Sequence, residues 1–134
     1  MCVGVTMVLG ACRNEDNIGD LFGQWQLVQY SENGVGVNPA AGSQCYISFE
    51  DHTAWVKSVD ADIHDYQSVF ASYEHRGDSL LMEFITRYGQ SDSLLIEQIL
   101  HFPSFSNSRF GVSKLDKESL ILQSESKVWK WRKY

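Results

Sequence analysis

Apolar and polar residues alternate with a period of two in several short segments of the chain. Trp25 and Leu27 fall on one side of such a segment, and Gln24 and Gln26 fall on the other side. Near the C-terminus two further tryptophans alternate with basic residues in the same way. Because successive side chains of a β-strand point to opposite faces, this pattern predicts strands with one buried and one solvent-exposed face.

These segments are roughly five to nine residues long, are rich in Val, Ile, Tyr, Phe and Trp, and are separated by turn residues. The predicted strands are Gly23–Tyr30, Gln44–Phe49, Thr53–Ser58, Ser68–His75, Ser79–Ile85, Leu94–Phe102, Arg109–Lys114, Ser119–Gln123 and Lys127–Lys133. Between two of them, Arg76-Gly77-Asp78 provides a glycine that can adopt positive φ, which makes this the strongest hairpin. The segment from Leu94 to Leu100 also fits two turns of helix, and this alternative stays open.

The predicted strands follow one another through short connections. This arrangement favours an all-β fold in which an antiparallel up-and-down meander closes into a small barrel. We expect about eight strands in one domain that spans residues 21–134. A barrel that crosses a membrane needs strands of roughly 9–11 residues, and most of these segments are shorter. The sequence therefore predicts a barrel with an apolar interior and a polar outer face.

The N-terminal residues 1–11 carry no charge, and their last three residues form the quartet Leu9-Gly10-Ala11-Cys12 together with the next residue. This quartet resembles the bacterial lipobox, at which a signal peptidase cleaves before the cysteine and a lipid is attached to the sulfur. The resemblance implies a signal-peptide remnant at residues 1–11, lipidation of Cys12 and a lipidated tether at residues 12–20. Such a protein lies in the bacterial cell envelope as an outer-membrane lipoprotein that faces the periplasm or the cell surface. It contacts the membrane through its lipid anchor only.

The same segment departs from a typical signal peptide, because no Lys or Arg precedes Arg13. The alternative is a buried first β-strand that contains Val3, Val5 and Val8. A run of this length is too short to cross a bilayer as a helix, which takes about 20 residues. The lipobox and the strand therefore both stay open for this segment.

The charge and cysteine content disfavour some partners and roles. The chain has 11 basic and 17 acidic residues and a net charge of -6, which opposes binding to a phosphate backbone, so nucleic acid is not an expected partner. Once Cys2 is removed and Cys12 is acylated, Cys45 has no partner for an intramolecular disulfide. Cys45 lies in a predicted strand with no base nearby, and we interpret it as a small buried hydrophobe.

No residue pattern points to catalysis, a metal or a cofactor. The histidines His52, His64, His75 and His101 do not pair at the spacings of metal ligands. The acidic loop at residues 59–65 begins like a calcium loop but lacks the glycine and the bidentate glutamate that such a loop needs. Nucleophile elbows, phosphate-binding glycine loops and zinc-protease motifs are absent from the sequence. We therefore expect a protein that is not an enzyme and has no catalytic residues, metal site or cofactor.

The start of the first predicted strand, Gly23-Gln24-Trp25, resembles the Gly-x-Trp motif of lipocalins and related calycin barrels. It follows residues 17–22, which fit a short helical turn. A lipobox also precedes it, as in bacterial lipocalin-like lipoproteins. The resemblance implies the same closed barrel that the alternation predicts.

The resemblance also implies which residues seal the floor of the barrel. In that family the tryptophan plugs the closed end, which assigns Gly23 and Trp25 to the floor. A basic residue of the last strand packs across the indole. Arg132 is the first candidate for this role, with Lys130 and Lys133 as substitutes. A cation over an indole contributes about 0.5–2 kcal/mol.

Six aromatic residues of the predicted strands are candidates for an internal ligand cavity. They are Tyr46, Trp55, Tyr73, Phe84, Trp129 and Trp131. A barrel of about eight strands is either filled by its own side chains or holds one small ligand, so these residues form either a packed core or an apolar cavity. The mouth of such a cavity would lie between the loops at residues 31–43 and 103–108.

These observations lead to one functional hypothesis and two alternatives. The hypothesis is a lipid-anchored lipocalin-like binding protein of the cell envelope whose ligand is a small hydrophobic molecule. The first alternative is a protein–protein interaction module that uses the barrel as a scaffold and contacts an unidentified partner through exposed loops, such as that of Phe105 and residues 59–65. The second alternative is an inhibitor or an enzyme on a calycin scaffold, since a fold does not establish a function.

Overall fold

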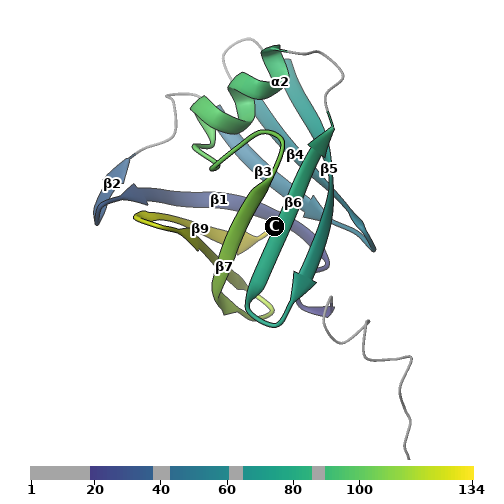
Figure 1. The fold of residues 1–134 in the computed structure, drawn as a ribbon, viewed down its shortest axis with the longest axis vertical. Coiled ribbons are helices and arrows are strands. Elements are labelled where there is room, and N and C mark those ends of the chain that lie inside the picture. Colours follow the sequence, from purple (N-terminus) through teal and green to yellow (C-terminus); the bar gives the residue numbers. More distant parts are fainter. Residues whose placement is uncertain (1–18, 38–42, 61–64, 86–89) are drawn as a thin grey trace, which may run out of the picture.

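The computed structural model describes residues 19–37, 43–60, 65–85 and 90–134, whose strands form one antiparallel sheet (Figure 1). The strand order is β2-β1-β3-β4-β5-β6-β7-β8-β9, and an additional pairing between β1 and β9 closes the sheet. Eight strands, β1 and β3 to β9, therefore form a closed barrel. The all-β fold with up-and-down connectivity that the sequence predicts is confirmed.

The strands agree closely with the predicted segments. They are β1 (Gly23–Glu32), β2 (Val35–Val37), β3 (Ser43–Phe49), β4 (Thr53–Asp60), β5 (Asp65–Arg76), β6 (Ser79–Ile85), β7 (Ser108–Leu115), β8 (Ser119–Ser124) and β9 (Lys127–Lys133). Two helical elements, α2 (Gln90–Leu94) and the π-helical η1 (Leu95–Ile99), lie between β6 and β7. Strands β6 and β9 have the predicted bounds.

The strand predicted at residues 94–102 is wrong, because this segment begins as a helix. Leu95, Ile96 and Leu100 are buried, whereas the residues at 97 and 98 are exposed. This spacing follows the turns of a helix, the alternative that the sequence left open, and not the period of two of a strand. The helical segment lies over one end of the barrel, the upper end in Figure 1.

Two tight hairpin turns depend on backbone with positive φ. The loop predicted at residues 31–43 contains the short strand β2, which forms a hairpin with β1. Its turn residues Asn33 and Gly34 have φ values of 54° and 80°, as a two-residue hairpin turn requires. The hairpin predicted at residues 76–78 is also present, with Gly77 at a φ of 57°.

Several predicted features fall wholly or partly outside the described residues. The signal-peptide remnant at 1–11, Cys12 and most of the tether lie outside them. The helical turn predicted at residues 17–22 lies partly outside, and the described part begins with helical backbone at Gly19, followed by a turn. Within the described ranges, no helix is both long and apolar enough to span a membrane.

Inward-facing side chains from all eight barrel strands form one core. In β6, Leu80, Met82 and Phe84 are buried, while Glu83 between them is exposed. In β9, two buried tryptophans flank an exposed lysine. The alternation that predicts the strands thus also divides each strand between the interior and the surface.

Candidate functional site

Trp25, near the start of β1, is fully buried. Its indole Nε1 donates a hydrogen bond to the carbonyl of Leu21 at 2.9 Å, so the segment before β1 folds back under the barrel. Gly23 has a φ of 119°, a conformation that favours glycine. A Cβ atom there would also lie 3.1 Å from the Nζ of Lys133. Gly23, Trp25 and Lys133 thus lie together at the start of β1, where the sequence resemblance places the floor.

The basic residue over Trp25 is Lys133, and the first candidate, Arg132, is wrong. The Nζ of Lys133 lies 4.3 Å from the centroid of the Trp25 ring and donates to the carbonyls of Asp20 and Phe22. Burial lowers the pKa of Lys133. The register places Lys133 opposite Trp25, while the neighbouring Arg132 points outward. On the outer face Arg132 donates two hydrogen bonds to the Oε1 of Gln26, at 3.0 and 2.7 Å.

Tyr73, one of the candidate cavity residues, lies inside the barrel near this floor. Its ring packs edge-on against Phe49, with centroids 5.1 Å apart, and its hydroxyl donates to the carbonyl of Glu50. Burial raises the pKa of Tyr73 to about 12. The hydroxyl therefore stays protonated at neutral pH and fastens the β3–β4 turn to the interior.

Two of the six candidate cavity residues, Tyr46 and Trp55, point away from the interior, and these predictions are wrong. Tyr46 is buried on the outer face under Tyr134, with ring centroids 5.0 Å apart, and its hydroxyl donates to the Oε1 of Gln44 at 2.7 Å. Trp55 is 46% exposed. The reason is the period of two: Cys45 and Ile47 point inward on either side of Tyr46, as Ala54 and Val56 do on either side of Trp55.

The upper end of the barrel is covered by the segment that follows η1. Trp129, a predicted cavity residue, is fully buried, and its Nε1 donates to the carbonyl of Leu100 at 2.6 Å. Phe102 packs edge-on against Trp129 with centroids 5.5 Å apart, and it lies 6.0 Å from Phe84, another predicted cavity residue.

His101 belongs to this cover. It has a φ of 60° and stacks on Tyr30, with ring centroids 4.6 Å apart. Burial, together with the charge of Lys127, lowers the pKa of His101. The hydroxyl of Tyr30 donates a hydrogen bond to the carboxylate of Glu32 at 2.7 Å. Burial and this hydrogen bond raise the pKa of Tyr30. Both stacked rings are therefore neutral at neutral pH.

Acidification is expected to destabilise the fold through His101. The pKa of His101 is lower in the folded chain than in the unfolded chain, where it is about 6.5, so the unfolded chain binds more protons in this window. The contribution of neutral His101 to the free energy of unfolding is therefore complete above the pKa of the unfolded chain. It is lost as the pH falls toward the lower pKa of His101 in the folded chain. Urea denaturation at about pH 7.5 and about pH 5 measures this loss. His101→Asn, which tolerates positive φ, should lose less on acidification, and an equal loss in the variant would contradict this role.

The interior is lined unevenly. Apart from Ile47, Phe49 and Tyr73, strands β3, β4 and β5 present small side chains inward, namely Cys45, Ala54, Val56, Val69 and Ala71. Large aromatic side chains of β1, β7 and β9 line other parts of the same core. Among these, Trp131 is 2% exposed, and its buried Nε1 has no hydrogen-bond acceptor within the described part of the chain. An unpaired buried donor costs about 1–3 kcal/mol, so an acceptor atom inside the barrel would be stabilised there.

Cys45 is buried inside the barrel. Burial raises the pKa of the Cys45 thiol, which disfavours the thiolate that a nucleophile needs. Within the described ranges, no group of three His, Cys, Asp or Glu side chains is placed to hold a metal ion. His64 lies outside these ranges.

The comparisons with known proteins agree with this architecture. A family model described as a lipocalin-like domain matches residues 7–134. A solved structure of a lipocalin-like protein from Bacteroides uniformis ATCC 8492 has a TM-score of 0.69 and 21% identity, covering 87% of this chain and 100% of that chain. An uncharacterized protein from Bacteroides eggerthii DSM 20697 has a TM-score of 0.67 and 16% identity, covering 86% of this chain and 100% of that chain.

No curated protein matches the chain. At the identities given, the two solved structures show a common fold. The match to the family model extends over the barrel with its floor and its cover. The chain therefore belongs to the lipocalin-like domain family.

Proposed function

We propose that this chain is a lipid-anchored binding protein of the bacterial cell envelope that holds one small hydrophobic ligand inside its barrel. The observation that supports the ligand is the unpaired Nε1 of Trp131 inside an otherwise apolar core. The small side chains of Cys45, Ala54, Val56, Val69 and Ala71 line part of the same interior. A largely apolar site with few polar groups is the usual form of a small-molecule pocket. The expected ligand is therefore apolar with a single acceptor group.

Native mass spectrometry of the purified full chain tests this proposal. We expect a complex with one copurified hydrophobic compound per chain. Ala71→Leu fills the interior from among these small side chains and should abolish the complex, whereas Ser72→Leu places the same side chain on the outer face and should preserve it. If the interior is instead packed solid, no compound is retained and Ala71→Leu lowers the free energy of unfolding by about 1–3 kcal/mol.

The anchor rests on the resemblance of residues 9–12 to a lipobox. We propose that Cys12 carries the lipid and that the protein is an outer-membrane lipoprotein facing the periplasm or the cell surface. Cys12→Ser should move the protein from the membrane fraction to the aqueous fraction of a bacterial lysate and should abolish labelling by a fatty acid. Cys45→Ser, which leaves the lipobox intact, is the matched control. Membrane association that survives Cys12→Ser would contradict the anchor.

The proposal assigns a binding role and no catalytic one. Its partners are the hydrophobic ligand and, through the anchor alone, the membrane. No cofactor, metal or nucleic acid is part of it. The net charge of -6 disfavours nucleic acid.

A further inference from the structure

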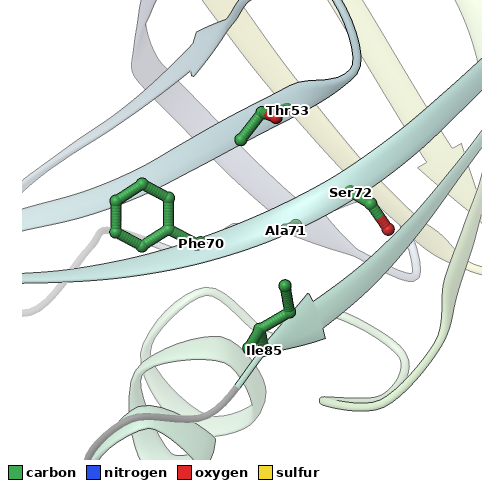
Figure 2. Close-up of a pocket in the computed structure, with 5 residues that line it drawn as sticks. All are labelled: Thr53, Phe70, Ala71, Ser72 and Ile85. Atoms are coloured by element: carbon green, nitrogen blue, oxygen red, sulfur yellow. The ribbon is translucent and has the colours of Figure 1, made fainter.

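The outer wall of the barrel has a hollow beside an exposed tryptophan. All four tryptophans lie in the described part of the chain, and Trp55 alone is exposed. The described residues that line the hollow, of about 170 Å³, are Ser48, Glu50, Thr53, Trp55 and Phe70. A larger hollow of about 350 Å³ shares Thr53 and Phe70 with it and extends across β5 to Ile85 on β6 (Figure 2).

Two aromatic side chains form walls of the smaller hollow. Trp55 lies directly opposite Phe70 in the pairing of β4 with β5, and both side chains point outward. Their ring centroids are 4.9 Å apart and the ring planes meet at 77°. The face of an aromatic ring carries partial negative charge, which attracts a cation within about 6 Å of the ring centroid.

A carboxylate completes the lining. Glu50 belongs to the β3–β4 turn, where its backbone N–H donates to the carbonyl of Thr53 at 2.8 Å and its carbonyl accepts from the hydroxyl of Tyr73. The turn is therefore held from both sides. The described lining includes this carboxylate and no basic side chain. Lys57 lies two residues after Trp55 on the outer face of β4, whereas Thr53 lies two residues before it. The charge at the Glu50 side of the hollow thus complements a cation.

We propose that this hollow binds an organic ammonium ion. The cationic group lies against the rings of Trp55 and Phe70 and beside the carboxylate of Glu50. Apolar substituents of the cation extend over Phe70 toward Ile85 in the larger hollow. Because these side chains point outward, the site is separate from the barrel interior, and neither proposal depends on the other.

Titration of the full chain with choline tests the site. Trp55 is the exposed indole, so its fluorescence reports on the hollow, while the buried tryptophans provide a constant background. We expect a saturable change in emission with choline. In the neutral isostere 3,3-dimethylbutan-1-ol, carbon replaces the charged nitrogen. This alcohol should bind more weakly than choline by a factor of about five or more. No saturable change with choline, or equal binding of the alcohol, would overturn the proposal.

Two matched charge variants separate the site from the overall charge of the protein. Glu50→Gln should weaken choline binding by about three- to fivefold, whereas Glu118→Gln makes the same change in the β7–β8 turn and should leave it unchanged. Trp55→Leu, followed by calorimetry, should abolish binding. Thermal melting verifies that each variant folds, and if Trp55→Leu does not fold, the two charge variants decide. Equal weakening by both charge variants would refute a specific site.

Discussion

Trp25→Ala is expected to lower the free energy of unfolding by about 3–5 kcal/mol, the range for removal of a large buried aromatic side chain. The variant loses the indole that closes the floor, its hydrogen bond to Leu21 and its contact with Lys133. Since small domains are stable by about 5–15 kcal/mol, such a loss leaves this chain close to unfolding. Urea denaturation followed by circular dichroism measures the change.

The two neighbouring basic residues provide the control for the floor. Lys133→Met removes the cation over Trp25 and two hydrogen bonds to backbone carbonyls, and should destabilise the fold measurably. Arg132→Met removes hydrogen bonds between exposed side chains and should change stability by less than about 0.5 kcal/mol. A larger loss for Arg132→Met than for Lys133→Met would contradict the assignment of the floor.

Trp129→Ala is expected to produce a loss of similar size, about 3–5 kcal/mol, at the other end of the barrel. Trp129 contacts Tyr30, Phe102 and Phe110, and its Nε1 fastens the segment after η1 to β9. Trp129→Phe keeps most of the apolar contact and leaves the carbonyl of Leu100 unpaired, so it should cost about 1–3 kcal/mol.

Hydrogen exchange distinguishes loosening of the cover from global loss of stability. In Trp129→Phe, the amides of η1 and of residues 100–102 should exchange faster relative to those of β3 and β4 than they do in the unchanged chain. Uniform acceleration throughout the barrel would show that Trp129 contributes only to the common core. The cover would then not be held by its hydrogen bond to Leu100.

The strands could be predicted because alternation and turn chemistry agree along the chain. Strands β6 and β9 begin and end where predicted, since turn residues border clear alternation on both sides. The segment at 94–102 could not be settled, because a continuous apolar run such as Leu94-Leu95-Ile96 suits a buried strand as well as a helix. Its helical state depends on the barrel beneath it, which buries Leu95 and Ile96.

The residues that face the barrel interior could be predicted less well than the strands, because the direction of each side chain depends on its position within the strand. Aromatic character alone points to Tyr46 and Trp55, although counting from Ile47 and from Val56 by steps of two places both outside. The same count from Trp131 places Lys133, and not Arg132, on the inner side. The family resemblance supplied the kind of residue over Trp25, and the parity of the strand determines which residue it is.

The exchange of the four indole N–H groups with solvent, followed by NMR, tests the central claim that this chain is a barrel closed at both ends. We expect the indole N–H of Trp55 to exchange rapidly. Trp25 and Trp129 should be protected by their hydrogen bonds, and Trp131 should be protected by burial alone. Exchange of Trp25 or Trp129 as fast as that of Trp55 would contradict the account, because an end of the barrel would then be open to water.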